Sequence, residues 1–284
     1  MELIEWQVPA NFNLFLFGDL HIGSTMYSKD GINKLVDMML SVYKEVKPKN
    51  NFGLCHGDVI EGIMIDDPRF DPLVHKDFVT DQEDTVVDTL WPVRDKLVTI
   101  LDGNHPRKLW RFGDITKRIS SRLGVKYGTW SCRVSYLDHK HKLVFKHFAT
   151  HGRKAISSTA DDPMRRLVNM KLILKRHLRD LSGDCLLRSK GHTHRLFRIK
   201  PLKDLYLVDD GKKIKQAYTL AAPVELPIHP DRCWYVNTGS FLRLYSELGV
   251  SGYAEMAEYA PLEIGFAVVV VRNRQIRDVD LITV

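Results

Sequence analysis

Five short apolar runs in this chain each end abruptly in polar residues rich in aspartate, asparagine, histidine and glycine. Apolar runs of this length are typical of buried strands. In the first half of the chain they alternate with segments whose apolar residues recur at helical spacing, which predicts a layered α/β fold. The five polar clusters are GDLHIG (18–23), GDVIEG (57–62), GNH (103–105), THG (150–152) and GHTH (191–194).

The spacing of apolar residues predicts individual elements. Helices are expected from Ile32 to Val46, from Asp81 to Lys96 and from Pro163 to Leu181. We expect one domain over residues 1–284, with a hairpin-like excursion near 204–230, because no repeat or linker interrupts the chain. The expected strands span residues 12–18, 52–56, 97–101, 132–137, 142–148, 185–190, 196–200, 215–220, 233–237, 241–245, 266–271 and 279–284.

Composition narrows the class of protein and its partners. The formal net charge of +7 and the pI near 9.1 favour an anionic partner such as nucleic acid. No apolar run approaches the roughly 20 residues of a membrane span, and the first ten residues lack a signal-peptide pattern, so we expect a cytoplasmic protein without a membrane partner. The four cysteines form no C-x-x-C pair and are expected to be reduced and buried.

The polar clusters are expected to meet in one pocket. In layered α/β proteins, ligands bind at the carboxyl ends of the strands, so loops far apart in sequence can converge there. Aspartate, asparagine and histidine supply the oxygen and imidazole ligands that divalent metal ions prefer. The neighbouring glycines let the backbone turn sharply around such an ion. The clusters therefore predict a metal centre.

The order of the clusters resembles the pattern of the calcineurin-like metallophosphoesterase family. That pattern is D-x-H, G-D-x-x-(D/E), G-N-H-(D/E), a lone histidine often followed by glycine, and G-H-x-H. The resemblance extends from about Phe12 to Ser240, because VNTGSF (236–241) is similar to the family's N-P-G-S segment, with Thr238 in place of proline. It implies a four-layer α/β/β/α sandwich with the site at one end, in a family that includes DNA-repair nucleases.

The resemblance also implies a ligand set for two divalent metal ions. Manganese is the expected metal, with iron, zinc and others as alternatives, because mixed nitrogen and oxygen ligands suit several of these ions. Asp58 would bridge the pair. The first metal would take Asp19, His21 and His194, and the second Asn104, His151 and His192.

Two further residues are expected to be catalytic. His105 stands where the family keeps a histidine that contacts the phosphate and protonates the leaving oxygen. Pro106 departs from the pattern, since an acidic residue is common at that position. Glu61, three residues after Asp58, is expected to orient the His105 ring instead.

The chemistry can also be argued without reference to the family. Two divalent ions, two carboxylates and a bridging hydroxide leave the site with a net charge of about +1, which attracts phosphate. Two metals roughly 3.5–4 Å apart can activate a shared water for in-line attack on phosphorus. A metal-dependent phosphoesterase acting by a metal-bridging hydroxide is therefore expected.

The substrate is predicted from a basic helix between the fourth and fifth clusters. Lys171, Lys175 and Arg179 recur every four residues and share one face, and Arg153 lies nearby. This row could follow a nucleic-acid backbone, which favours a nuclease acting on DNA or RNA; an ordinary solvated face is the other interpretation. A small-substrate phosphatase, a nucleotide or cyclic-nucleotide phosphodiesterase and a non-catalytic binding module on the same fold are the alternatives.

Histidines outside the clusters are expected to have structural, supporting or surface positions. His147, on the strand that leads to His151, is expected to be structural. His56 either supports the ligands or fills the core. The remaining five are expected at the surface: His75, His139, His141, His177 and His229.

Overall fold

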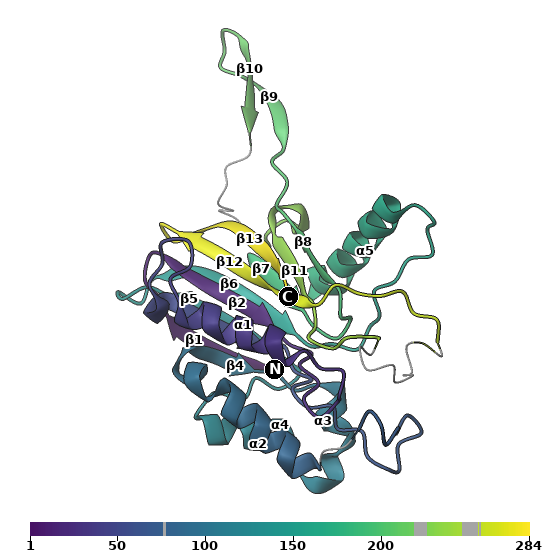
Figure 1. Ribbon diagram of the computed structural model, residues 1–284. Helices are drawn as coiled ribbons and strands as arrows, with labels where there is room; N and C mark the ends of the chain where they lie inside the picture. The colour runs from purple at the N-terminus through teal and green to yellow at the C-terminus, as the bar shows by residue number, and fades with distance from the viewer. Residues whose placement is uncertain (76–77, 219–225, 246–254, 256) are drawn as a thin grey trace.

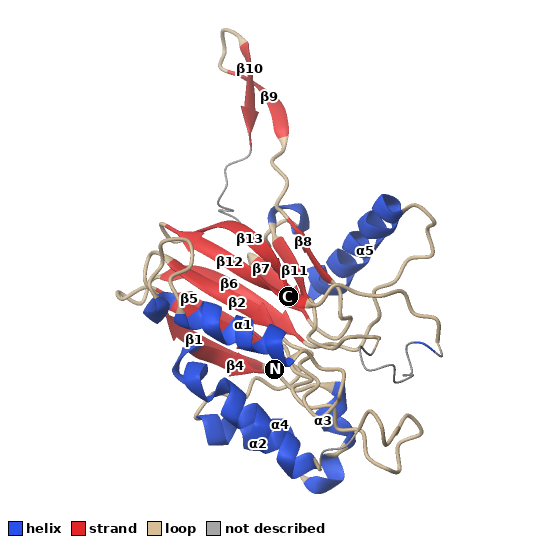
Figure 2. Ribbon diagram, viewed as in Figure 1, coloured by secondary structure: helices blue, strands red, loops and turns tan. Residues whose placement is uncertain are grey.

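The computed structural model describes residues 1–75, 78–218, 226–245, 255 and 257–284 (Figure 1). Helices and strands alternate in the first half of the chain, as the sequence predicts, and the fold is mixed α/β (Figure 2). The helices are α1 (Lys29–Leu40), α2 (Val79–Leu90), α3 (Asn104–Lys108), α4 (Ile115–Leu123) and α5 (Pro163–Leu178). Short 3₁₀ segments span Pro48–Asn50, Trp91–Lys96, Trp110–Phe112, Arg179–Leu181 and Pro230–Arg232.

One mixed sheet has five strands in the order β13-β12-β2-β3-β4. Neighbours β2, β3 and β4 run parallel, whereas β12 is antiparallel to both β2 and β13. The strands are β2 (Phe12–Phe17), β3 (Asn51–Cys55), β4 (Leu97–Ile100), β12 (Gly265–Arg272) and β13 (Gln275–Thr283).

A second mixed sheet has six strands in the order β1-β5-β6-β7-β11-β8. Its parallel pairs are β1–β5, β6–β7 and β7–β11. The strands are β1 (Glu2–Gln7), β5 (Ser131–Leu137), β6 (Leu143–Thr150), β7 (Leu187–Lys190), β8 (Leu196–Ile199) and β11 (Trp234–Thr238).

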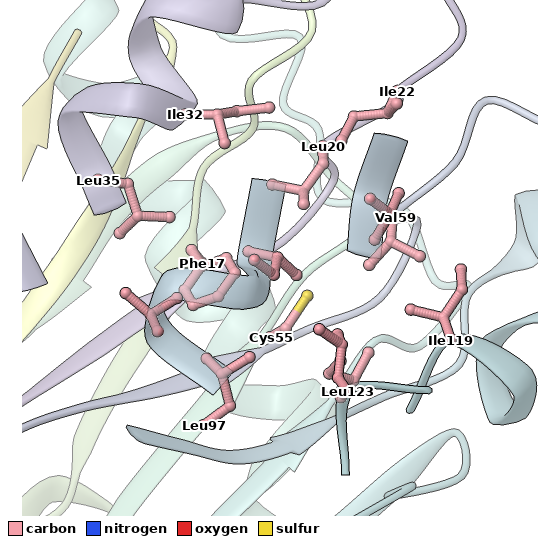
Figure 3. Close-up of a cluster of buried hydrophobic side chains, with 14 of the residues drawn as sticks. Phe17, Leu20, Ile22, Ile32, Leu35, Cys55, Val59, Leu97, Ile119 and Leu123 are labelled. Atoms are coloured by element: carbon pink, nitrogen blue, oxygen red, sulfur yellow. The ribbon is translucent and has the colours of Figure 1, made fainter. Parts of the chain in front are cut away.

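Strand β2 shows why the two sheets pack together. Both of its faces are buried, as expected for a central strand covered on each side. Leu14 and Leu16 join a cluster that also contains Val134 and Val236 of the second sheet. Phe15 and Phe17 point the other way, into a cluster with residues of α1, α2 and α4, including Ile32, Leu35, Ile119 and Leu123 (Figure 3).

Helix α5 covers part of the second sheet on a separate face. Its residues Met170, Leu174 and Leu178 recur at helical spacing and pack with Phe148 of β6 and Tyr235 of β11. Asp162 caps the helix by accepting a hydrogen bond from the Arg165 amide. The apolar face is therefore buried, as the spacing predicted.

Three local predictions were wrong. The first helix ends at Leu40 rather than Val46, because Lys44 and Glu45 adopt positive φ angles in a tight turn that pairs Tyr43 with Val46. The second helix changes to 3₁₀ form at Trp91 because Pro92 has no amide hydrogen to donate. Residues 241–245 contribute an isolated bridge at Leu242 rather than a strand.

Two features lie at the edges of the fold. Strand β1 was not predicted; it is an edge strand whose residues are mostly exposed, so its apolar pattern is weak. Within the 204–230 excursion, β9 (Leu205–Asp209) and β10 (Ile214–Tyr218) pair as an antiparallel hairpin that projects from the sheets (Figure 1). Residues 219–225 of that range lie outside the described residues.

Among the described residues, no helix is long and apolar enough to cross a membrane.

Candidate metal centre

The five polar clusters follow the carboxyl ends of β2, β3, β4, β6 and β7. Main-chain hydrogen bonds join the loops to one another. The Asp19 amide donates to the Gly57 carbonyl at 2.8 Å, and the His21 amide donates to the Asp58 carbonyl at 3.1 Å. The Gly191 amide donates to the Thr150 carbonyl at 3.1 Å. Loops distant in sequence are thus held together by main-chain hydrogen bonds at the ends of the strands.

Five of the predicted ligands have a strained backbone. Positive φ angles in residues other than glycine cost on the order of 1–3 kcal/mol each and persist where surrounding structure enforces them. Such residues cluster at functional sites in proteins. The φ angles are 51° at Asp19, 50° at His21, 46° at Asp58, 73° at His192 and 54° at His194.

Asp19, His21 and His194 form one group whose potential ligand atoms lie within 4.8 Å of one another. His21 Nε2 lies 3.2 Å from His194 Nε2, and His194 Nε2 lies 3.4 Å from Asp19 Oδ1. These are the three residues predicted for the first metal.

Asp58, His151 and His192 form a second group within the same 4.8 Å limit. His151 Nε2 lies 3.2 Å from Asp58 Oδ2 and 3.0 Å from Asn104 Oδ1. Asp58 also groups with His21 and His105. It therefore lies between the two predicted metal positions, as a bridging ligand would.

The donor atoms in both groups fit a cation. The His21 Nδ1 atom hydrogen-bonds to the Glu61 carboxylate at 2.6 Å, and His151 Nδ1 hydrogen-bonds to the His56 carbonyl at 2.6 Å. Because those oxygens only accept, Nδ1 carries the proton in each neutral ring and Nε2 presents a lone pair to the site. Asp19 Oδ1 is buried without a hydrogen-bond partner among the described residues. A cation would satisfy these converging lone pairs.

The electrostatics of the metal-free site agree with this assignment. Burial opposes ionisation of Asp58, but neighbouring His151 and His105 hold its pKa well below the ordinary value. Burial likewise disfavours a charged His151, yet Asp58 and Asp19 raise its pKa to about 9. Burial and the His151 charge lower the pKa of His192 to about 4. In the metal-free protein, a proton on His151 thus occupies the position that a cation would take.

Glu61 and His105 are neighbours, but their contact differs from the prediction. His105 Nδ1 hydrogen-bonds to the main-chain carbonyl of Glu61 at 2.5 Å, while the carboxylate Oε2 is 3.8 Å from that nitrogen. The hydrogen bond of the carboxylate at 2.6 Å is to His21. Glu61 therefore orients His105 through its backbone and a ligand histidine through its side chain.

A buried network supports the second group from behind. The Ser189 hydroxyl lies 2.6 Å from His56 Nε2 and 2.6 Å from His147 Nε2, and all three side chains are buried. The His56 carbonyl accepts the hydrogen bond from His151. His147 is therefore structural, as predicted, and His56 both fills the core and supports a ligand.

The two groups of potential metal ligands open into a cleft of about 730 Å³. His21, Asn104, His105, His192 and His194 line it together with apolar residues. The apolar lining comes from three parts of the chain: Met26, Ile63 and Val74; Ala155 and Ile156; and Leu242, Leu244, Tyr259, Ala260 and Leu262. This combination suits a ligand with an anionic group and a less polar portion.

Sequence reasoning missed His75 and Arg195, which both line the cleft. His75 was expected at the surface, but its side chain is 9% exposed and its Nε2 lies 3.5 Å from Glu61 Oε1. No spacing in the sequence marks it, because it is brought in by a loop. Arg195 directly follows the last ligand histidine, and that adjacency was the signal available for it.

The four predicted substrate-binding cations are not part of this cleft. Arg153, Lys171, Lys175 and Arg179 do not line it, so far as the described residues define it. Lys175 forms an ion pair with Asp231, and Arg179 forms one with Asp180. The basic row therefore lies outside the immediate site and is partly neutralised.

No protein-family model matches the chain, and no curated protein matches its sequence.

Proposed function

We propose that this protein is a dinuclear-metal-dependent phosphodiesterase of the calcineurin-like type, with the four-layer α/β/β/α arrangement of that family. The observation that carries the proposal is the convergence of Asp19, His21, Asp58, Asn104, His151, His192 and His194 from five loops. When bound there, two divalent ions such as Mn²⁺ would supply an activated water and positive charge for the phosphoryl oxygens.

The roles of the chain's own residues follow from their contacts. Asp58, between the two groups, would hold the ions at a fixed separation. Glu61 fixes the His21 ring so that its Nε2 faces the site. His105, whose Nδ1 is bonded to a carbonyl, has its Nε2 available in the cleft to donate a proton to the leaving oxygen.

The protonation state of His105 depends on the substrate. Burial lowers the pKa of the free ring, although Asp58 opposes that effect. A phosphate anion beside the ring would favour the imidazolium form and raise that pKa. Binding of substrate would thus favour the protonated form of His105, which can donate a proton to the leaving group.

Nucleic acid is the substrate that we propose, because the chain is basic and its cleft combines arginines with an apolar wall. A nucleotide or cyclic-nucleotide phosphodiesterase is the second candidate. The cleft volume of about 730 Å³ favours it, as does the fact that the basic row does not line the cleft as the described residues define it.

Hydrolysis assays with Mn²⁺ test the proposal. The protein should cleave bis(p-nitrophenyl) phosphate faster than p-nitrophenyl phosphate, and Asp58→Ala should abolish both activities. A panel of single-stranded, double-stranded and cyclic nucleotide substrates then separates the two candidates. Inertness of every phosphate ester in the metal-loaded protein would leave a non-catalytic binding module as the explanation.

A further inference from the structure

Arg195 is a partly buried cation that lines the cleft. Its side chain lines the cleft beside ligands His192 and His194. Among the described residues, its guanidinium makes no hydrogen bond or ion pair. A guanidinium offers five donors, and leaving them unpaired in a partly desolvated position is unfavourable. The position is therefore suited to an external acceptor.

A second arginine strengthens the local positive charge. Burial and the nearby Arg166 charge both lower the pKa of Arg195. Arg166, in the first turn of α5, donates to the main-chain carbonyls of Ala160 at 2.9 Å and Asp161 at 3.4 Å. Those bonds hold Arg166 in place but do not neutralise it. Two like charges held together favour an anion between or beside them.

The backbone of Arg195 is rigidly anchored. Its carbonyl accepts hydrogen bonds from the Gly239 amide at 3.1 Å and from the Asn237 side-chain amide. The Asn237 amide also bonds to the Thr193 hydroxyl at 2.6 Å. An unpaired side chain on a fixed backbone is the arrangement of a prepared binding group rather than of a loosely solvated surface residue.

Arg195 and His105 occupy different surroundings in the cleft. His105 contacts Glu61 and stacks edge-on against His21, with ring centroids 4.6 Å apart. The charged neighbour of Arg195 is Arg166, in the first turn of α5. The phosphate under attack would lie at His105 and the metal ligands, so Arg195 is available for another anionic group.

We infer that Arg195, supported by Arg166, binds a second phosphate of the substrate, next to the diester that is cleaved. This inference rests on the proposed phosphodiesterase function and specifies its substrate: a chain of nucleotides with adjacent phosphates. A guanidinium can bind a phosphate bidentately, which gives both affinity and orientation. A cyclic mononucleotide has no second phosphate and would not use this group.

Three dinucleotides that differ only in terminal phosphate test the inference. Thymidylyl-thymidine has one diester and no other phosphate; the 5′-phosphorylated and 3′-phosphorylated forms add one at either end. With Mn²⁺, the unmodified protein should cleave one of the phosphorylated forms with a kcat/KM about 10-fold or more above that of the unphosphorylated compound. Arg195→Ala should remove that preference, and Arg195→Lys should retain part of it.

Controls separate this inference from its premise. Hydrolysis of bis(p-nitrophenyl) phosphate by Arg195→Ala should stay within about twofold of the unmodified protein. Arg277→Ala removes an exposed arginine on β13 and should keep the preference. If Arg195→Ala is poorly folded, Arg195→Gln and Arg195→Lys provide the same comparison.

The outcomes are distinct. Equal cleavage of all three dinucleotides by the unmodified protein would overturn the inference and leave the phosphodiesterase function intact. An equal loss on every substrate in Arg195→Ala would assign the residue to the scissile phosphate and also overturn it. Failure to hydrolyse even the aryl diester would instead remove the proposed function.

Discussion

Glu61 Oε2 lies 2.6 Å from His21 Nδ1, on the side of the ring that faces away from the candidate metal centre. Both side chains are buried. Burial opposes ionisation of Glu61, but the contact with His21 holds the pKa of the carboxyl well below its ordinary value. A carboxylate that accepts a hydrogen bond from the Nδ1 atom of a histidine increases the electron density on Nε2 and fixes the orientation of the ring. Glu61 should therefore act mainly on metal affinity.

Glu61→Gln should weaken metal binding at the group of Asp19, His21 and His194. The amide keeps the shape but loses the charge, and loss of such a partner typically costs 10–100-fold in metal affinity. Competition with a chelator would measure the change. Glu83→Gln is the matched control, because Glu83 is a buried glutamate that pairs with Arg118 instead. Unchanged affinity in Glu61→Gln would contradict the supporting role.

Asp58→Ala should lower metal content from two ions to at most one per chain and reduce hydrolysis to background. Asp58 participates in groups on both sides of the site, so its loss affects both positions. Asp58 Oδ1 also accepts a hydrogen bond from the His105 amide at 2.8 Å, and Asp58→Asn can keep that bond. Metal analysis of both variants, with circular dichroism to check folding, tests the two-metal assignment. Full turnover in either variant would be incompatible with a bridging role.

His105→Ala should affect substrates according to their leaving group. Diesters with alkoxide leaving groups should lose about 10²–10⁴ in rate, whereas p-nitrophenyl esters should lose much less, because their leaving oxygen needs little protonation. Metal content should hardly change. Rates for a dinucleotide and an aryl diester, measured in parallel, provide the test. A uniform loss on both substrates would argue against proton donation.

The sequence predicted which polar side chains converge, because each follows a strand whose apolar run is readable. Asp19 follows β2 and Asp58 follows β3, and these two strands are parallel neighbours. Their convergence is therefore a consequence of the sheet topology. The hydrogen-bond partner of the Glu61 carboxylate could not be predicted, because His21 and His105 lie at similar distances from Glu61 in the sequence. Side-chain geometry decides between them. His75 is brought to the cleft by a loop, and the periodicity of the sequence does not predict how a loop folds.

The basic row on α5 should contribute to polymer binding less than its three charges suggest. Lys175 is already paired with Asp231 and Arg179 with Asp180, so replacing Lys171, Lys175 and Arg179 by alanine removes about one unpaired charge. The slope of log affinity against log salt should then flatten by about 0.9 for duplex DNA rather than about 2.7. Hydrolysis of a small aryl diester should be nearly unchanged.

A charge-matched control comes from the projecting hairpin region. Lys212, Lys213 and Lys215 are exposed there, and Lys215 is likewise paired, with Asp210. Replacing these three by alanine should leave the salt slope nearly intact. If the two triple variants behave alike, only net charge matters and the α5 row has no specific role.

The buried His147 should make the metal-free protein sensitive to mild acid. Burial, with a contribution from His56, holds the pKa of His147 well below its ordinary value of 6.5. As pH falls below 6.5, the unfolded chain gains a proton at this position that the folded chain does not, so the free energy of unfolding decreases. Each such proton changes that free energy by at most about 1.4 kcal/mol per pH unit. Stability from this source is complete above pH 6.5 and is lost as pH falls.

His147→Gln should flatten that dependence, since glutamine does not titrate and can still bond to the Ser189 hydroxyl. Urea unfolding of the metal-free protein between pH 5 and 7.5 would measure it. A residual slope of the same sign should remain from His56, whose pKa burial lowers to about 4. His139→Gln, which changes an exposed histidine, should leave the slope as it is. Parallel curves for His147→Gln and the unmodified protein would mean that His147 does not remain neutral in the folded state.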